Sequence, residues 1–147
     1  MNRTVRLITN SHMTGVGPLV VAQPLPTAAL RIADPFLLLH HAGPQTFEAG
    51  ATAHRIDPHP HRGFEPVTFV YRGSVLHRDS LGNEGRIRAG EVQWITSGSG
   101  IVHSEGPTAD LQESGGELEL IQLWVNLPAA KKMIDPAYQE LHRTDIP

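Results

Sequence analysis

Short strand-like runs, separated at close intervals by glycine and proline, constrain the fold of this chain most strongly. β-Branched and aromatic residues gather in segments of strand length, for example at 67–71, 74–79 and 91–96. The 14 Gly and 12 Pro residues punctuate such segments along the chain. Together the sequence predicts eight or more strands at a spacing of about ten residues, which is typical of β-sandwiches and barrels. We therefore expect an all-β domain.

The remaining elements follow from the same patterns. Further strands or extended stretches are expected at 4–9, 18–26, 36–41, 86–88, 101–105 and 117–127. The apolar run at 36–41 predicts a buried strand that Gly43-Pro44 ends. Polar loops are expected at 47–57 and 106–116. Only the tail, 129–142, predicts helix, and Pro136 interrupts it.

Composition excludes several classes of site and partner. The 147 residues, 16.0 kDa in all, fit a single domain spanning 1–147. The absence of cysteine rules out disulfides, thiolate metal sites and a cysteine nucleophile. The net charge is −3 and the basic residues are scattered, so we expect no direct nucleic-acid binding. The sequence shows no signal peptide and no apolar run of membrane-spanning length, so we expect a cytoplasmic protein without membrane contact.

Two short segments carry residues that bind metals, His59-Pro60-His61 and His103-Ser104-Glu105. In an extended chain, residues two apart point the same way, so each segment presents a pair of ligands on one face. If the two segments lie side by side, three imidazoles and one carboxylate converge. This sulfur-free set suits Fe(II), Mn(II), Ni(II), Cu(II) or Zn(II). In a chain with nine histidines, a single His-x-His pair is also consistent with chance placement on the surface.

The other histidines have weaker claims to a functional role. We expect His77, which alternates with Asp79, to be a half-exposed strand residue, with orientation of a metal ligand as the alternative. His40 and His41 are expected to have core or hydrogen-bonding roles. Three further histidines are expected at the surface, namely His12, His54 and His142. Among the aromatic residues Phe64 is the best candidate to line a metal pocket, and the others expected in the core are Phe69, Trp94 and Trp124.

Several longer segments resemble the pirin family of the cupin superfamily. The segment from His59 to Thr68 is similar to the family signature, and the matches continue in register at 77–83, 90–105, 123–128, 132–133 and 136–139. The resemblance begins near Phe36 and runs to the last residues. It implies a cupin-type double-stranded β-helix, a jelly-roll barrel, with little helix, mainly near the C-terminus. It also implies that 1–147 corresponds to the N-terminal, metal-binding barrel of a protein with two such barrels.

The resemblance also implies a ligand set. Carried over, the metal ligands are His59, His61, His103 and Glu105, and the metal is a divalent ion, most often iron, with Mn, Ni, Co, Cu and Zn as alternatives. The general cupin pattern instead takes its carboxylate shortly after the His-x-His pair, which would make Glu65 the ligand. With Glu105 as ligand, Glu65 either contacts a metal ligand or the substrate, or is only the residue that begins a strand.

Two functions follow from the resemblance. The first is a quercetin 2,3-dioxygenase-type oxidoreductase that acts on a flavonol or a similar enolic or phenolic small molecule, with Glu105 as the catalytic general base. The alternative is a non-catalytic, iron-dependent regulator that binds a transcription factor or an enzyme. Because family members pack this barrel against a second one, we also expect a homodimer.

Overall fold

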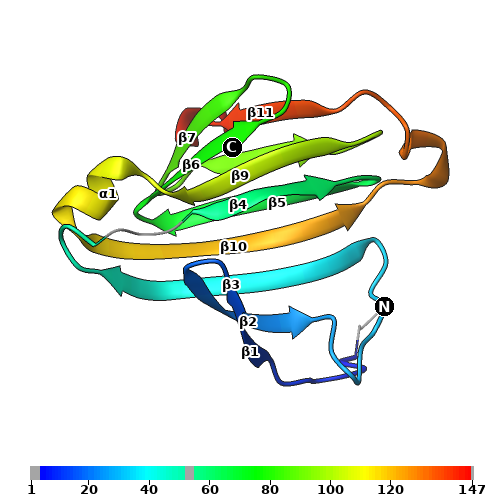
Figure 1. Ribbon diagram of the computed structural model, residues 1–147. Helices are drawn as coiled ribbons and strands as arrows, with labels where there is room; N and C mark the ends of the chain where they lie inside the picture. Colours follow the sequence, from blue (N-terminus) through cyan, green and yellow to red (C-terminus); the bar gives the residue numbers. More distant parts are fainter. Residues whose placement is uncertain (1–3, 52–54, 147) are drawn as a thin grey trace.

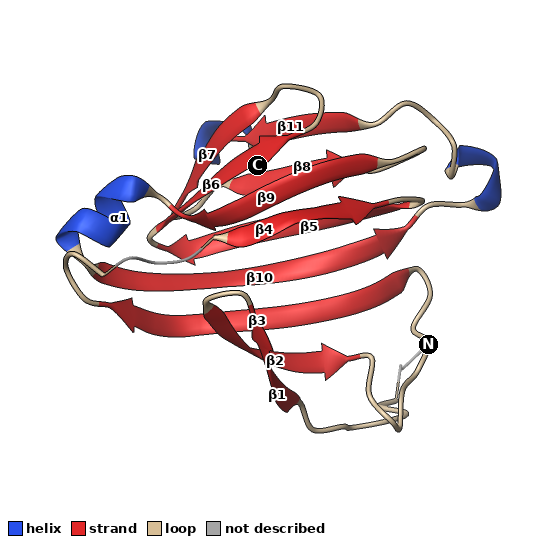
Figure 2. Ribbon diagram, viewed as in Figure 1, coloured by secondary structure: helices blue, strands red, loops and turns tan. Residues whose placement is uncertain are grey.

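Antiparallel β-strands make up most of this computed structural model, which describes residues 4–51 and 55–146 (Figures 1 and 2). In chain order the strands are β1 (His12–Val16), β2 (Leu19–Leu25), β3 (Phe36–Phe47), β4 (Ile56–His61), β5 (Phe64–Arg72), β6 (Ser74–Asp79), β7 (Glu84–Arg88), β8 (Val92–Thr96), β9 (Ile101–Pro107), β10 (Gly116–Asn126) and β11 (Ala137–Leu141). One α-helix, α1 (Ala109–Ser114), and the 3-10 turns η1 (Ala129–Lys131) and η2 (Arg143–Asp145) complete the described part of the chain. The all-β expectation is confirmed.

The strands form two sheets. A seven-stranded sheet has the order β1-β2-β3-β10-β5-β8-β11, and a four-stranded sheet has the order β4-β9-β6-β7. Every paired strand in both sheets is antiparallel. Strands that are neighbours in space are often distant in the chain, as with β3 beside β10 and β4 beside β9. The two segments that carry the predicted ligands therefore become adjacent strands of one sheet.

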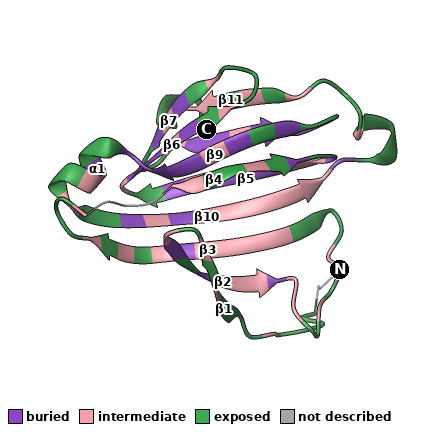
Figure 3. Ribbon diagram, viewed as in Figure 1, coloured by how far each residue is buried: buried purple, intermediate pink, exposed green. Residues whose placement is uncertain are grey.

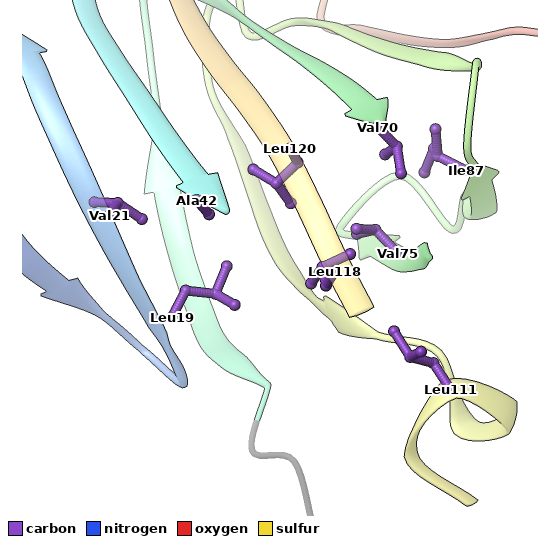
Figure 4. Packing of buried hydrophobic residues seen from close by; sticks show 9 residues of the cluster. All are labelled: Leu19, Val21, Ala42, Val70, Val75, Ile87, Leu111, Leu118 and Leu120. Carbon is purple, nitrogen blue, oxygen red and sulfur yellow. The ribbon is translucent and has the colours of Figure 1, made fainter. Parts of the chain in front are cut away.

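The main hydrophobic core lies between the two sheets. The seven-stranded sheet contributes Val70 from β5 and Leu118 from β10, and the four-stranded sheet contributes Val75 from β6 and Ile87 from β7 (Figure 4). All of these side chains are at most 2% exposed. Figure 3 shows the buried stretches along β5, β6 and β9, whereas much of β3 is only partly covered. One face of the four-stranded sheet thus packs against the apolar side chains of the seven-stranded sheet.

Strand β3 is longer and less buried than its sequence predicts. It continues through Gly43-Pro44 to Phe47, because a register shift between Leu118 and Leu120 of β10 accommodates the break. Gly43 lies against the side chain of Glu119 with φ of +157°, a conformation that L side chains rarely adopt. The predicted burial of its first residues is wrong, since Phe36 is 42% exposed.

The predicted first strand at 4–9 is also wrong. Those residues form no strand, and Val5 and Ile8 are 78% and 85% exposed. None of the described strands pairs with these residues, so an alternating sequence alone does not produce a strand here. The first strand begins instead at His12.

The chain has little helix, as expected, but its one described α-helix lies where a loop was predicted. The segment 106–116, expected to be a loop, contains α1, which buries Leu111 against the core and ends at Gly115 with φ of +71°. The tail 129–142, expected to be helical, contains only the short η1 and then β11, whose backbone pairs with β8. No helix in the described residues is long and apolar enough to cross a membrane.

Candidate metal centre

Three histidines from neighbouring strands meet in the four-stranded sheet. His59 and His61 lie on β4 and His103 lies on β9, where His59 is directly opposite His103. His61 is two residues from His59 and so projects to the same side of the strand. Each histidine offers one ring nitrogen, and these three atoms lie within 4.8 Å of one another. The structure therefore brings together the three histidines that the two sequence segments predict.

The environment keeps two of these imidazoles neutral. His61 is 6% exposed and His103 is 1% exposed. Burial is the main cause that lowers the pKa of His61 to about 4, and the adjacent His103 and His59 lower it further. Burial likewise lowers the pKa of His103 to about 3, with contributions from His59 and His77. A metal binds the neutral imidazole, so both rings are in the ligating form at neutral pH.

The hydrogen bonds of the group leave nitrogen lone pairs available. His59 Nδ1 lies 2.8 Å from the backbone carbonyl of Asp57, which can only accept. The proton of a neutral His59 is therefore on Nδ1 and the lone pair is on Nε2. His103 Nε2 is buried and has no hydrogen-bond partner in the described part of the protein. A buried, unpartnered nitrogen beside two further imidazoles fits a divalent metal ion.

Glu105 lies on the same strand, two residues after His103, and is 7% exposed. Its carboxylate oxygens accept hydrogen bonds from Gln122 Nε2 at 2.8 Å and from Gln93 Nε2 at 3.3 Å. Its negative charge acts on His61 and opposes the lowering of that pKa. Among the described residues, the group of ligand atoms within 4.8 Å contains the three imidazoles without Glu105. Its role as a fourth ligand therefore stays a prediction.

The two glutamines that hold Glu105 are absent from the residues predicted for the site. Gln93 is 0% exposed, and Gln122 is fixed by a hydrogen bond of 3.1 Å that its oxygen accepts from Trp124 Nε1. The sequence does contain a signal for Gln93, since an amide between Val92 and Trp94 stands within an apolar strand. A polar side chain in such a position is buried only where it has hydrogen-bond partners.

The alternative carboxylate, Glu65, lies on the seven-stranded sheet. It is half-buried on β5 and accepts a hydrogen bond of 2.7 Å from the Thr96 hydroxyl. Like Glu105, it lies outside the group of imidazole nitrogens in the described residues. The choice between the two carboxylates is one that substitution has to decide.

Aromatic rings line one side of His61. Phe64 and Trp124 both contact the His61 ring edge to face, with ring centroids at 5.1 Å and 5.0 Å. They stack on each other at 4.4 Å. Phe64 thus lies beside the histidines, as expected, and Trp124, expected in the core, joins it there, only partly buried.

His77 is fully buried, so the expectation of a half-exposed residue is wrong. Its Nδ1 lies 3.3 Å from Nδ1 of His103, and its Nε2 lies 3.1 Å from Oδ2 of Asp79. Burial raises the pKa of Asp79, but hydrogen bonds from Asn83, His77 and the amide of Leu81 outweigh it and lower that pKa overall. The alternative considered for His77, a contact that orients a metal ligand, agrees with this geometry.

Among the described residues, the other histidines do not belong to this group of three ligand nitrogens. His40 and His41 are half-buried and hydrogen-bond Gln23 and Glu119, respectively. His12 and His142 are exposed, as expected. His54 is outside the described residues.

Comparison with known proteins identifies the family. The pirin family model matches residues 19–125. The chain belongs to the pirin family. It is 52% identical over 114 residues to a Pseudomonas aeruginosa protein named "Putative quercetin 2,3-dioxygenase PA2418", covering 78% of this chain and 40% of that protein. It is 44% identical over 117 residues to Pirin-1 of Arabidopsis thaliana, covering 80% of this chain and 37% of that protein.

Solved structures agree with this assignment and confirm the cupin-type fold. A quercetin 2,3-dioxygenase from Acinetobacter baumannii superposes with a TM-score of 0.87 at 42% identity, over 94% of this chain and 49% of that one. The bacterial pirin YhhW from Escherichia coli, in complex with nickel(II), gives a TM-score of 0.70 at 27% identity over 88% of this chain and 53% of that one. The chain thus spans half or less of the length of its first curated relatives.

Proposed function

We propose that this protein is a metal-dependent, quercetin 2,3-dioxygenase-type oxidoreductase that acts on a flavonol or a similar enolic or phenolic molecule. His59, His61, His103 and Glu105 would hold the metal, with iron as the first candidate. The observation that carries the proposal is the buried Nε2 of His103, which has no partner in the described structure and lies beside two further imidazoles. The relatives named as quercetin dioxygenases and the nickel(II)-bound pirin support the same reading.

The bound metal would supply a Lewis acid and a redox centre for the substrate oxygens. The chain supplies neutral imidazoles, because the lowered pKa values of His61 and His103 keep both rings unprotonated at neutral pH. No proton then has to leave either ring before a ligand bond forms.

In this proposal Glu105 receives the hydroxyl proton of an enolic or phenolic substrate. Each of its oxygens accepts one amide hydrogen bond, from Gln122 and from Gln93. A carboxylate oxygen has further acceptor capacity, so these bonds orient Glu105 and leave room for a proton or a metal.

Phe64 and Trp124 give the site an apolar side. Their rings stack on each other and contact His61, so this side of the centre offers aromatic surface. A flat, aromatic substrate gains stacking and apolar contact against such rings. Their presence therefore favours a flavonol-like molecule over a small polar acid.

The test is oxygen uptake by the iron-loaded protein in the presence of a flavonol, with metal content measured on the same sample. We expect metal-dependent uptake that Glu105→Gln reduces by about 100-fold or more, the scale of a lost general base. Glu65→Gln is the matched control, and we expect it to retain metal and activity. If Glu65→Gln loses the metal and Glu105→Gln keeps it, the ligand assignment is wrong.

Absence of turnover with Fe, Mn, Ni, Co and Cu would overturn the enzymatic proposal for flavonols. The chain covers 40% of its P. aeruginosa relative, so turnover in this assay would show that a chain of this length suffices for activity. A metal-loaded protein that does not turn over a flavonol but binds a protein partner in stoichiometric amount would support the regulator.

A further inference from the structure

A chain of buried side chains leads away from the candidate metal centre to the loop after β6. His103 Nδ1 lies 3.3 Å from His77 Nδ1, and His77 Nε2 lies 3.1 Å from Asp79 Oδ2. The side chains of His77 and Asp79 are both 0% exposed. His77 therefore uses Nδ1 toward His103 and Nε2 toward Asp79, and His103 has only its Nε2 left for the metal site.

Asp79, the last of these hydrogen-bonded side chains, acts only as a hydrogen-bond acceptor. Oδ1 of Asp79 accepts the backbone amides of Leu81 at 2.9 Å and of Asn83 at 3.0 Å, and Oδ2 accepts the Asn83 side-chain amide at 2.9 Å. All of these partners are N–H donors, so the carboxylate that fits them is the ionised one, which only accepts. His77 Nε2 must then carry a proton to make its bond to Oδ2.

The hydrogen bond to Asp79 determines which nitrogen carries the proton in His77 and, through it, in His103. A neutral His77 with its proton on Nε2 has a lone pair on Nδ1, so it accepts from His103 Nδ1. The proton of His103 is then on Nδ1, and its lone pair is on Nε2. That Nε2 is the buried atom for which the described structure offers no hydrogen-bond partner.

A second contact holds the plane of the His77 ring. Tyr138 on β11 stacks on it with ring centroids 4.3 Å apart and an angle of 7° between the planes. The Tyr138 hydroxyl donates a hydrogen bond of 2.9 Å to Glu140 and lies so close to Gly85 that any side chain there would overlap it. Packing and hydrogen bonding thus both determine the orientation of His77.

We infer that His77 and Asp79 are positioning residues that hold His103 in its Nδ1–H tautomer, with the Nε2 lone pair directed toward the metal. The metal part of this inference rests on the proposed function. The tautomer does not, because it is a property of the protein without metal. Hydrogen-bonded partners of metal-binding histidines change metal affinity by about 10–100-fold when they are lost.

The test is the tautomer of His103 in the metal-free protein labelled with ¹⁵N-histidine, read from long-range ¹H–¹⁵N correlations at neutral pH. We expect the Nδ1–H form in the wild type. In Asp79→Asn the amide can donate to His77 Nε2, which moves the His77 proton to Nδ1 and turns His103 Nδ1 into an acceptor. We therefore expect His103 to shift to the Nε2–H form in this variant, and Fe(II) to bind about 10–100-fold more weakly.

Two further variants separate positioning from general stability. His77→Phe keeps a ring against Tyr138 but removes the acceptor, and we expect it to yield a mixture of His103 tautomers. Glu84→Gln changes the charge by the same amount as Asp79→Asn on an exposed side chain that pairs with Arg78, and we expect no change in tautomer or Fe(II) affinity.

The wild-type spectrum decides the inference even if a variant does not fold. An Nε2–H form of His103 in the wild type would overturn it, as would a tautomer unchanged in folded Asp79→Asn and His77→Phe. If the wild type binds no Fe(II) but His103 shows the Nδ1–H form that Asp79→Asn reverses, the proposed function fails and the positioning role stands.

Discussion

His103 and His59 lie opposite each other on β9 and β4, yet different parts of the chain orient them. Buried side chains determine the position of His103, with His77 hydrogen-bonded to it and Asp79 and Tyr138 holding His77 in turn. His59 is half-buried and hydrogen-bonds the backbone carbonyl of Asp57. The β9 side is therefore specified by side chains, and the β4 side is specified by the path of the main chain.

This difference has consequences for mutation. A carbonyl is present whatever the side chain at that position, so the tautomer of His59 tolerates substitution of its partner. The partners of His103 are particular residues in a space that is closed to water, where an unpartnered polar group destabilises the protein most. The predictions below test whether the two sides really respond so differently.

The largest difference in Fe(II) affinity between the two sides is expected when His103 or His59 is itself removed. His103→Ala should weaken Fe(II) binding by more than about 100-fold, because water does not readily replace a ligand in a buried position. This loss exceeds the one expected when a hydrogen-bonding partner of a ligand is removed. His59→Ala should have a smaller effect, about 10-fold, because solvent can reach its position. Titration of the metal-free variants with Fe(II) gives both affinities. Equal losses would contradict the proposed asymmetry.

Acid should destabilise the metal-free protein through the buried side. His61 has a pKa of about 4 in the folded protein against 6.5 unfolded, so the unfolded chain binds more protons between these values. The contribution of His61 to the free energy of unfolding is therefore fully present above pH 6.5. It falls by about 3 kcal/mol as the pH drops toward 4. His103 acts in the same direction.

Urea unfolding of the metal-free protein at a series of pH values measures this effect. His61→Gln should flatten the dependence between pH 6.5 and 4, because it removes one of the titrating groups. A wild-type free energy of unfolding that stays constant over this range would show that burial does not suppress protonation of these rings.

A smaller effect is expected at Gly85, below the Tyr138 hydroxyl. Gly85→Ala would introduce a methyl group where the hydroxyl lies, and overpacking of this kind destabilises a protein by about 1–3 kcal/mol. The matched control is Gly15→Ala, since no atom lies within 4 Å of a Cβ at that position. Thermal unfolding compares the two, and an equal change in both variants would contradict the close packing of Tyr138.

The smallest effect is expected at Asp57. Asp57→Ala removes an exposed carboxylate but keeps the carbonyl that accepts from His59 Nδ1. Fe(II) affinity should change by less than about threefold, below the range for loss of an outer partner. A change as large as that of Asp79→Asn would show that the side chain of Asp57, and not its backbone, supports His59.

Local patterns in the sequence predict the strands near the centre well. The strand expected at 74–79 has the bounds of β6, and 91–96 and 117–127 differ from β8 and β10 by only a residue at one or both ends. Here β-branched and aromatic residues stand between clear turns, so propensity and tertiary pairing agree. Strand periodicity likewise puts His59 and His61 on one face, but their meeting with His103 depended on the two segments lying side by side, as β4 and β9 do.

Features that depend on distant partners could not be predicted in this way. The segment 4–9 alternates like a strand but pairs with none of the described strands, whereas 137–141 lacks a strong pattern and becomes β11 because β8 offers it backbone partners. The burial of His77 depends on Tyr138, far away in the chain. The hydrogen bonds from Gln93 and Gln122 to Glu105 join three strands, and no local spacing reveals them.

The pairing of β4 with β9 also bears on how the protein folds. These strands are neighbours in the sheet, but β5, β6, β7 and β8 lie between them in the chain. His61 and His103 therefore meet only after a long loop has closed, a late and slow event in folding. A metal that needs both residues cannot help to start folding. The metal would instead stabilise the protein by slowing its unfolding, because the histidines that bind the metal come together only once the native sheet is complete.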